Sequence, residues 1–413
     1  MRVSLITKFA VRTLRRKVRR TLLSVIGVGV GCAIAMFMVS FSRGGNEIRF
    51  RSIADSGFGH MRIAPAGWEE NRENELRLQN MSADLEAVRS SKAVKVAAPH
   101  ARTTALLAFG TRVTGAEMLG VDPPAEQRIS RIARAVSEGR YLEEGDRGAT
   151  VIGSTIAQRL DVELDDDLFI TVAAKDGNVE YGMLRIVGII DTGSREMDAS
   201  ICHVTLEDME SLTGLEGAGE ISITLNDYRH IARMVPKFRE SIPEGDAVIT
   251  WREILPEQAG DLAGDRAFRN IIIGIVILVV ILGITSARLT AVLERKREFA
   301  VLVALGMKSV QIVRLIFLEA LVVGAIGAVT GLLLITPVVY HTATRGIDFS
   351  GVLGGDTALS GVLFEPTMYS DMGFWMIPFA FAVALASTVV ASIYPVWFAL
   401  KVNPTSALSL REA

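Results

Sequence analysis

The sequence predicts an α-helical membrane protein with four transmembrane helices and a large α/β domain, outside the membrane, between helices 1 and 2. Two observations support this fold class. Four long stretches of the 413 residues are apolar and almost free of charge, and an unbroken, mostly polar block, residues 42–269, separates the first two stretches. A chain of this length has room for a membrane part and one soluble domain.

Each apolar stretch is near or above the length of a spanning helix, which needs about 20 mainly apolar residues. Three of the stretches contain no Asp, Glu, Lys or Arg, and the remaining one contains only Glu319. A helix also satisfies its own backbone hydrogen bonds, which lipid cannot do. The uncharged stretches are Thr21–Phe41, Asn270–Ala287, Leu315–Tyr340 and Met372–Leu400, and the predicted spans are 21–41, 270–287, 315–340 and 372–396.

The distribution of basic residues predicts the orientation of the chain. Residues 1–20 and 288–314 are rich in Lys and Arg, whereas the loop 341–371 is mainly acidic. By the positive-inside rule, both termini (1–20 and 397–413) and the segment 288–314 are expected in the cytoplasm. Residues 1–20 alternate apolar and basic side chains, so we predict an amphipathic helix on the inner membrane surface. Because a span follows at once, a topological signal is favoured over nucleic-acid binding.

The block 42–269 is predicted to be a mixed α/β domain with a helical stalk at each end. Its stalks are expected at 42–56 and 252–269. Short runs rich in β-branched and apolar residues predict strands. These runs are Ala105–Phe109, Glu117–Val121, Leu168–Ala173, Met183–Ile190, Ile201–Val204 and Glu220–Leu225. Helices are predicted at 80–92, 153–161, 206–213 and 228–241. A turn at 175–178 is predicted to join two strands as a hairpin.

Small residues recur at helical spacing inside two of the predicted spans. The positions concerned are Gly27 and Gly31 in the first span and Gly324, Gly327 and Gly331 in the third. Glycine at such spacing lets another helix approach closely. The pattern is equally compatible with packing inside one subunit and with an interface between two subunits.

Several classes of function have no sequence support. The chain contains no Gly-x-x-x-x-Gly-Lys-Ser/Thr run that would cradle a nucleotide. The five histidines and two cysteines have no metal-site spacing, and we expect Cys32 and Cys202 not to pair. No motif frames a catalytic nucleophile. We therefore predict no catalytic, cofactor-binding or metal-binding residues. A membrane-anchored enzyme is the least favoured interpretation of the sequence.

A short cytoplasmic segment is a candidate for contact with a partner. Arg297 and Glu298 begin it and Gly306 can end it, as glycine often ends a helix. Phe299, Val301, Leu302 and Leu305 could form one apolar face of the helix between them. The simpler interpretation is an amphipathic connector at the membrane surface.

These features together resemble the FtsX/MacB-type ABC transporter permeases. The run Glu294–Met307, ERKREFAVLVALGM, is similar to the cytoplasmic signature of that superfamily, and Tyr394-Pro395 with Asn403-Pro404 is similar to its C-terminal tail. Gly120–Pro123, Val151–Gly153 and Val187–Ile189 resemble its periplasmic module. The size and layout are most similar to the lipoprotein-releasing (LolC/LolE) group. Val303 and Ser406 depart from the usual Arg and Glu, and Trp397-Phe398 are bulkier than is usual there.

The resemblance implies a function and partners. The chain would be an inner-membrane permease subunit with a MacB-like periplasmic domain, working above a cytoplasmic ABC ATPase dimer that binds ATP and Mg²⁺. A second permease subunit, identical or paralogous, would complete it. The implied activity is the release of lipoproteins to a periplasmic carrier, and the segment 297–306 would couple it to the ATPase. The resemblance also allows a MacB-like role in efflux and an FtsX-like regulation of a periplasmic enzyme.

The predicted hairpin is a candidate for docking the carrier. Asp176, Gly177, Asn178 and Tyr181 lie at or near its turn. A plain surface turn is the simpler interpretation of the same residues.

Overall fold

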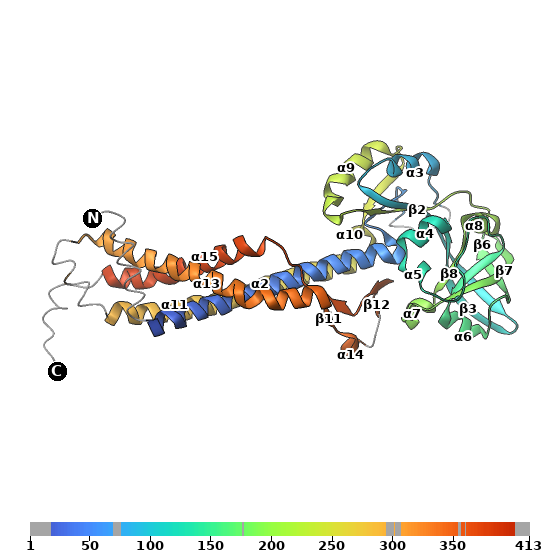
Figure 1. Cartoon of the computed structure of the whole chain (residues 1–413). Coiled ribbons are helices and arrows are strands. Elements are labelled where there is room, and N and C mark those ends of the chain that lie inside the picture. The colour runs from blue at the N-terminus through green and yellow to red at the C-terminus, as the bar shows by residue number, and fades with distance from the viewer. Residues whose placement is uncertain are drawn as a thin grey trace. The chain divides into compact units, whose positions relative to one another are not determined.

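The computed structural model describes residues 18–68, 76–175, 177–294, 301, 307–353, 357–359 and 361–400 (Figure 1). The chain forms two compact units. The helical unit comprises Met1–Gly45, Gly264–Ile347 and Met368–Ala413, and the α/β unit comprises Asn46–Ala263 and Asp348–Thr367.

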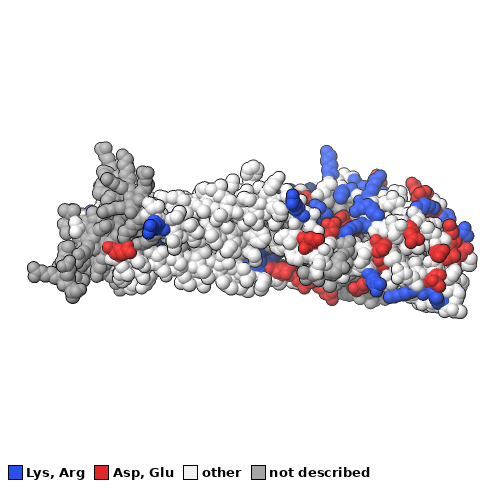
Figure 2. Space-filling view, turned by 60° about the horizontal axis from the view of Figure 1, so that its bottom comes forward, with Lys and Arg blue, Asp and Glu red and all other residues white. Residues whose placement is uncertain are grey.

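The helical unit is built from four long helices, each long and apolar enough to cross a membrane. They are α2 (Val18–Ile53), α11 (Pro256–Glu294), α13 (Ser309–Arg345) and α15 (Met376–Leu400). On the face drawn in Figure 2, the middle of this unit shows no charged side chain, whereas Lys, Arg, Asp and Glu are interspersed over the α/β unit. The predicted fold class is confirmed: four apolar helices, with an α/β domain inserted between the first and the second.

All four helices extend beyond the predicted spans, and α15 begins at Met376 rather than at residue 372. α2 runs on to Ile53 and is followed by a π-helical turn, η1 (Ala54–Phe58), and α11 begins at Pro256, after the short helix α10 (Trp251–Ile254). Proline is favoured at the first position of a helix because its missing N–H is not needed there. The predicted helical character of 42–56 and 252–269 is therefore confirmed, with a break at Leu255.

A ten-stranded sheet forms the α/β unit. Its strands are β1 (Met61–Pro65), β2 (Val94–Phe109), β3 (Arg112–Val121), β4 (Val136–Gly139), β5 (Ala149–Gly153), β6 (Asp167–Ala173), β7 (Val179–Ile190), β8 (Ile201–Thr205), β9 (Glu220–Leu225) and β10 (Asp246–Thr250). The pairings β2–β3, β3–β8, β8–β5, β5–β7, β7–β6 and β6–β2 close six strands into a ring. From β2 the sheet continues through β9 and β1 to β10.

Short helices complete the unit. They are α3 (Met81–Arg89), α4 (Pro123–Ile129), α5 (Arg131–Arg134), α6 (Ser154–Leu160), α7 (Arg195–Asp198), α8 (Leu206–Thr213), the 3-10 turn η2 (Tyr228–His230) and α9 (Ile231–Ser241). The segment before α15 adds β11 (Ile347–Asp348), α14 (Ser350–Leu353), β12 (Thr357–Leu359), β13 (Val362–Phe364) and β14 (Thr367–Met368). All six strands and four helices predicted for the block 42–269 are present.

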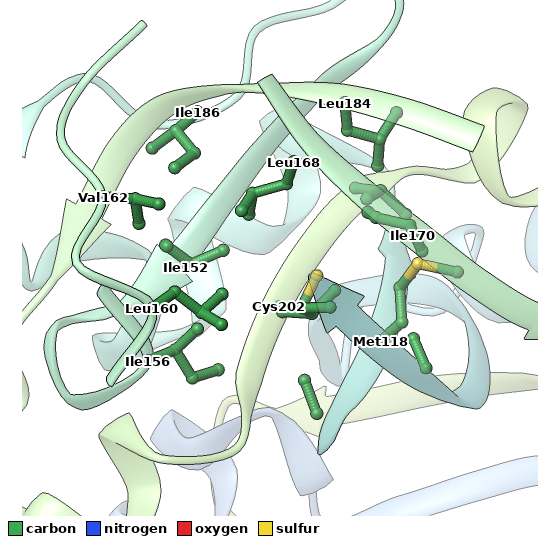
Figure 3. Close-up of a cluster of buried hydrophobic side chains, with 14 of the residues drawn as sticks. Met118, Ile152, Ile156, Leu160, Val162, Leu168, Ile170, Leu184, Ile186 and Cys202 are labelled. Atoms are coloured by element: carbon green, nitrogen blue, oxygen red, sulfur yellow. The ribbon is translucent and has the colours of Figure 1, made fainter. Parts of the chain in front are cut away.

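The largest buried cluster of the α/β unit fills the ring of strands. Figure 3 shows Leu168, Ile170, Leu184 and Ile186 of β6 and β7 pointing toward Met118 and Cys202 of β3 and β8. Side chains alternate between the two faces of a strand, so the residues between these point outward. Both Cys32 and Cys202 are buried free thiols.

Candidate functional site

The outer surface of the ring of strands carries an exposed apolar face. Among the described residues of the α/β unit, six large apolar side chains are strongly exposed, and all come from β2, β3, β6 and β7: Leu106, Val113, Phe169, Val179, Tyr181 and Met183. The strand register places these side chains on one side of the ring. One row of paired residues is Leu106, Thr171 and Tyr181, and the other is Val113, Ala108, Phe169 and Met183. Contiguous exposed apolar surface on a soluble domain marks an interaction site.

The predicted docking hairpin borders this apolar face. Tyr181 is 61% exposed and stacks on Phe169, with 5.6 Å between the ring centroids. The turn is closed by hydrogen bonds from Ala174 N–H to the Asn178 carbonyl (2.9 Å) and from Gly177 N–H to the Ala174 carbonyl (3.0 Å). Gly177 has φ +76°, a conformation that favours glycine. Asp176 lies outside the described residues.

Sequence reasoning missed most of the apolar face. It named Tyr181 but not Leu106, Val113, Phe169 or Met183. In parts of these strands, as at Leu168–Ile170 and Met183–Leu184, neighbouring inward and outward positions are both apolar, so the alternation that separates a core face from a solvent face is interrupted. The available signal was this interruption of the apolar–polar alternation, in strands of an otherwise polar domain.

A second feature of the α/β unit is a buried ion network beside a cavity of about 1020 Å³. Arg62 of β1 donates to Glu220 of β9 at 2.7 Å, and both side chains are 2% exposed. Arg102 of β2 bonds Glu220 at 3.0 Å and Glu117 of β3 at 2.7 Å. These guanidinium groups hold the pKa values of Glu220 and Glu117 below their usual range, against the effect of burial. The cavity wall also contains Phe58, Trp68, Ile254 and Leu255.

The network extends to a fully buried histidine. His100 Nε2 lies 2.7 Å from a Glu126 oxygen on α4, and His100 Nδ1 lies 3.7 Å from Glu220. Burial alone would lower the pKa of His100, but the two carboxylates raise it above its usual value. The pKa of Glu126 is lowered by His100 despite burial. The arrangement joins strands β1, β2, β3 and β9 to α4 through paired charges.

Two other buried histidines lack such pairing. His203 Nδ1 lies 2.8 Å from the Tyr141 hydroxyl, and His60 Nδ1 accepts the N–H of Leu225 at 3.0 Å. Burial lowers the pKa of each to about 4. Among the described ranges, no group of three or more His, Cys, Asp or Glu is placed to hold a metal ion.

In the helical unit, four of the five predicted packing glycines face close neighbours. A Cβ at Gly327 would lie 2.5 Å from Val28 Cγ1, and one at Gly331 would lie 2.8 Å from the Gly29 carbonyl, so these residues bring α13 against α2. A Cβ at Gly324 would lie 2.6 Å from Thr388 Oγ1 of α15, and one at Gly31 would meet Val280 of α11. A Cβ at Gly27 would have no neighbour within 4 Å.

Most of the predicted coupling segment lies outside the described residues, namely Arg297, Glu298, Phe299, Leu302, Leu305 and Gly306. Val301 is helical and 46% exposed. On either side of the segment, the ends of α11, α13 and α15 share a buried cluster that includes Val292, Ile312 and Val396.

Two protein families match consecutive parts of this chain. The MacB-like periplasmic core domain matches residues 21–241, and the FtsX-like permease C-terminal part matches residues 270–404.

Individual relatives match over almost all of the chain. The lipoprotein-releasing system transmembrane protein LolC of Xylella fastidiosa is 21% identical over 93% of this chain and 92% of its own length. LolE of Haemophilus influenzae is 23% identical, over 94% and 93%. The macrolide export ATP-binding/permease protein MacB of Campylobacter jejuni is 25% identical over 94% of this chain but 59% of its own length. The solved periplasmic region of MacB from Actinobacillus actinomycetemcomitans aligns with 49% of this chain and 92% of that region, at 12% identity and a TM-score of 0.35.

Proposed function

The chain belongs to the FtsX/MacB-type family of ABC transporter permeases, and we propose that it couples ATP hydrolysis by a separate ATPase to the release of lipoproteins from the inner membrane. Members of this family act with a cytoplasmic ABC ATPase, and no enzymatic role is indicated for this chain. The proposal also includes lipoproteins as the substrate, a soluble periplasmic carrier that receives them, and a second permease subunit.

The observation that carries this proposal is the extent of the match to the Lol relatives. Proteins named for lipoprotein release match over 92% and 93% of their own lengths, whereas the MacB relative matches over 59% of its length. The name of that MacB relative includes an ATP-binding part, and the 413 residues of this chain contain no Walker-type phosphate loop. We propose that a partner chain binds ATP and Mg²⁺.

Lipoprotein release requires an energy source. Withdrawing acyl chains from a bilayer costs about 0.8 kcal/mol for each methylene that leaves the lipid. For a lipoprotein with three acyl chains, spontaneous release would therefore be negligible. Coupling to ATP hydrolysis meets this requirement, and the segment 297–306 is our candidate for the contact with the ATPase. The continuous helices α2 and α11 are suited to pass a rigid-body movement along the chain, because a helix moves as one element.

The apolar face is our candidate docking surface for the soluble carrier. A carrier that shields acyl chains in water would itself present apolar surface, and Phe169, Tyr181 and Met183 offer a complementary one. Aromatic side chains are frequent anchors of such interfaces. The turn residues Asp176, Gly177 and Asn178 would contribute polar contacts at its edge.

Depletion of this protein followed by quantitative proteomics of separated inner and outer membranes tests the proposed function. We expect acylated lipoproteins to accumulate in the inner membrane. Normal lipoprotein sorting would contradict the proposal. It would favour a MacB-like role in efflux if substrate export were lost, or an FtsX-like regulatory role if a periplasmic enzyme lost its activation.

A further inference from the structure

The strand β2 has a stretch of open edge inside the α/β unit. Along one edge, β2 pairs with β9 from Val94 to His100 and with β6 from Ala105 to Ala108, while β3 occupies the opposite edge. Between these two ladders, at residues 101–104, no strand of the described chain pairs with the first edge. An open strand edge presents unpaired N–H and C=O groups, which are a template for pairing with another chain.

The backbone groups of Arg102 and Thr104 point toward this open edge. Glu117 of β3, the partner of Thr104, donates its N–H to the Ser200 carbonyl (2.8 Å) on the far side of β3. The pair Thr104–Glu117 therefore exchanges no hydrogen bonds, and because backbone direction alternates along a strand, Arg102 also points away from β3. Within the described ranges, no ladder pair and no other backbone hydrogen bond engages Arg102 on the open edge.

The cavity of about 1020 Å³ lies at this open edge. Arg102 and Thr104 line it, together with Gly219 and Ala173 at the ends of the two strands that stop on either side of the gap. The volume is at the upper end of the range for ligand pockets, about 300–1,000 Å³. The gap in strand pairing therefore opens into a space large enough for a short stretch of another chain.

The cavity wall is balanced in charge and partly aromatic. Its described lining residues include three arginines and three glutamates, besides His100. Arg62 pairs with Glu220, and Arg102 bridges Glu220 and Glu117, so the wall has no excess charge to select an anion or a cation. The Phe58 ring centroid lies 5.1 Å from the guanidinium carbon of Arg62 and 5.9 Å from that of Arg102. A peptide, which carries alternating donors and acceptors and varied side chains, matches this wall.

We propose that the cavity binds the extended polypeptide segment directly after the acylated residue of a lipoprotein, as an added strand on β2. The inference rests on the proposed function for the identity of the peptide. In strand addition, main-chain hydrogen bonds to an open edge provide affinity, and wall pockets accept alternate side chains. Gly115 lines the cavity and pairs with Leu106 of the apolar face, so the two surfaces are continuous. A segment held here would present its lipid-bearing end beside the surface that we propose for the carrier.

Site-specific photocrosslinking of the assembled transporter in cells tests the proposal. A photoreactive phenylalanine analogue at Gly115 has room in the cavity, because a Cβ at this position has no neighbour within 4 Å. We expect crosslinks that mass spectrometry maps to the segment directly after the acylated residue of lipoproteins. The same analogue at Arg233, which is exposed on α9 and does not line the cavity, is the control and should give no such crosslinks.

A pair of substitutions at Thr104 tests the strand addition itself. Proline is tolerated in a strand where its missing N–H would not join a ladder, so Thr104→Pro should fold and remove one donor from the open edge. We expect Thr104→Pro to reduce crosslinking from Gly115 roughly five-fold, the effect of one lost hydrogen bond. Thr104→Val keeps the N–H and the side-chain shape and should crosslink like the wild type. Thermal unfolding of the purified full chain checks that both variants fold, and if Thr104→Pro does not, the crosslinks from Gly115 alone decide.

The outcomes separate this inference from the proposed function. Lipoprotein retention on depletion, without crosslinks from Gly115 beyond those from Arg233, would overturn the cavity site and leave the release function standing. Crosslinks from Gly115 only to proteins that are not acylated would overturn lipoproteins as the occupant. Equal crosslinking by Thr104→Pro and Thr104→Val would overturn pairing with the edge of β2.

Discussion

At the scale of the residue, the buried histidines of the α/β unit fall into two classes with opposite effects on stability. His100 lies between the carboxylates of Glu126 and Glu220, which favour its protonated form and raise its pKa. His60 and His203 are buried without a carboxylate partner, and burial favours their neutral form and lowers their pKa values to about 4. Each class therefore links folding to pH in its own window.

We expect stability to be greatest near pH 6.5 and to fall on both sides. Below pH 6.5 the unfolded chain binds protons at His60 and His203, whereas the folded chain keeps both side chains neutral. The free energy of unfolding therefore falls by up to about 3 kcal/mol for each histidine as the pH approaches 4. Above pH 6.5 the unfolded chain loses its proton at His100 before the folded chain does, so the contribution of His100 is lost as the pH rises through its raised pKa. The midpoint of thermal unfolding of the full chain, measured from pH 4.5 to 8.5, checks both slopes.

Single substitutions separate these two slopes. His60→Gln should flatten the acid side, and His100→Gln should lower the maximum and flatten the alkaline side. His230→Gln, at an exposed position, is the control. An acid slope unchanged by His60→Gln and His203→Gln would show that other groups cause it.

The partners in these residue-scale arrangements could not be predicted from the sequence. Arg62, His100, Glu126 and Glu220 are separated by many residues of other types, and nothing in the local pattern links them. They meet because β1, β9 and β2 are neighbours in the sheet and α4 packs against β2. Ordinary charged residues become buried pairs only through long-range strand order, which hydrophobic periodicity does not specify.

At the scale of the element, the glycines of α13 differ from Gly27 of α2 in what they contact. Gly331→Val should destabilise the helical unit, since its Cβ would meet the Gly29 carbonyl, and backbone cannot move aside as a flexible side chain can. Overpacking of this kind typically costs 1–3 kcal/mol, on the order of several degrees in the unfolding midpoint. Gly27→Val should leave the stability of the isolated chain nearly unchanged, because the position is open.

The pair of variants also tests the two interpretations of these glycines that the sequence left open. If Gly27 packs against a second permease subunit, Gly27→Val should reduce recovery of the assembled complex while the single chain keeps its thermal stability. Recovery of the normal complex with Gly27→Val would show that Gly27 lies outside the interface. An undiminished midpoint for Gly331→Val would contradict the packing of α13 on α2.

Element prediction succeeded where a pattern was long or bounded by turns and failed for four short strands of the α/β unit. The four membrane helices follow from uninterrupted apolar length, and the β6–β7 hairpin follows from its glycine-containing turn. Four strands were not predicted: β1, β4, β5 and β10. β1 and β5 show no alternation because all five residues of each are buried, although the equally buried β8 was predicted. A short apolar run of this kind is equally compatible with a strand and with a piece of buried helix.

At the scale of the whole molecule, the domain organisation was predicted from the sequence: four apolar helices and an α/β domain inserted between the first two. It did so because membrane spans and soluble domains obey different compositional rules, which a single sequence displays directly. The apolar face was not predicted as a surface, since it is assembled from four strands. Its role can be tested separately from the role of the helices, because substitutions there should leave the membrane part and the ATPase contact intact.

The double variant Tyr181→Ser/Met183→Ser tests the role of the apolar face in the full protein. Both side chains are more than 60% exposed, so their loss should leave the fold intact. Loss of two interface anchors should weaken carrier binding by about 2 kcal/mol, or roughly 30-fold. We expect the complex to assemble and hydrolyse ATP, while lipoproteins remain in the inner membrane. Arg147→Ser, at a side chain that is 61% exposed, is the control and should sort lipoproteins normally. Normal sorting by the double variant would place the carrier elsewhere, whereas loss of ATP hydrolysis would mean that the apolar face acts on coupling rather than on docking.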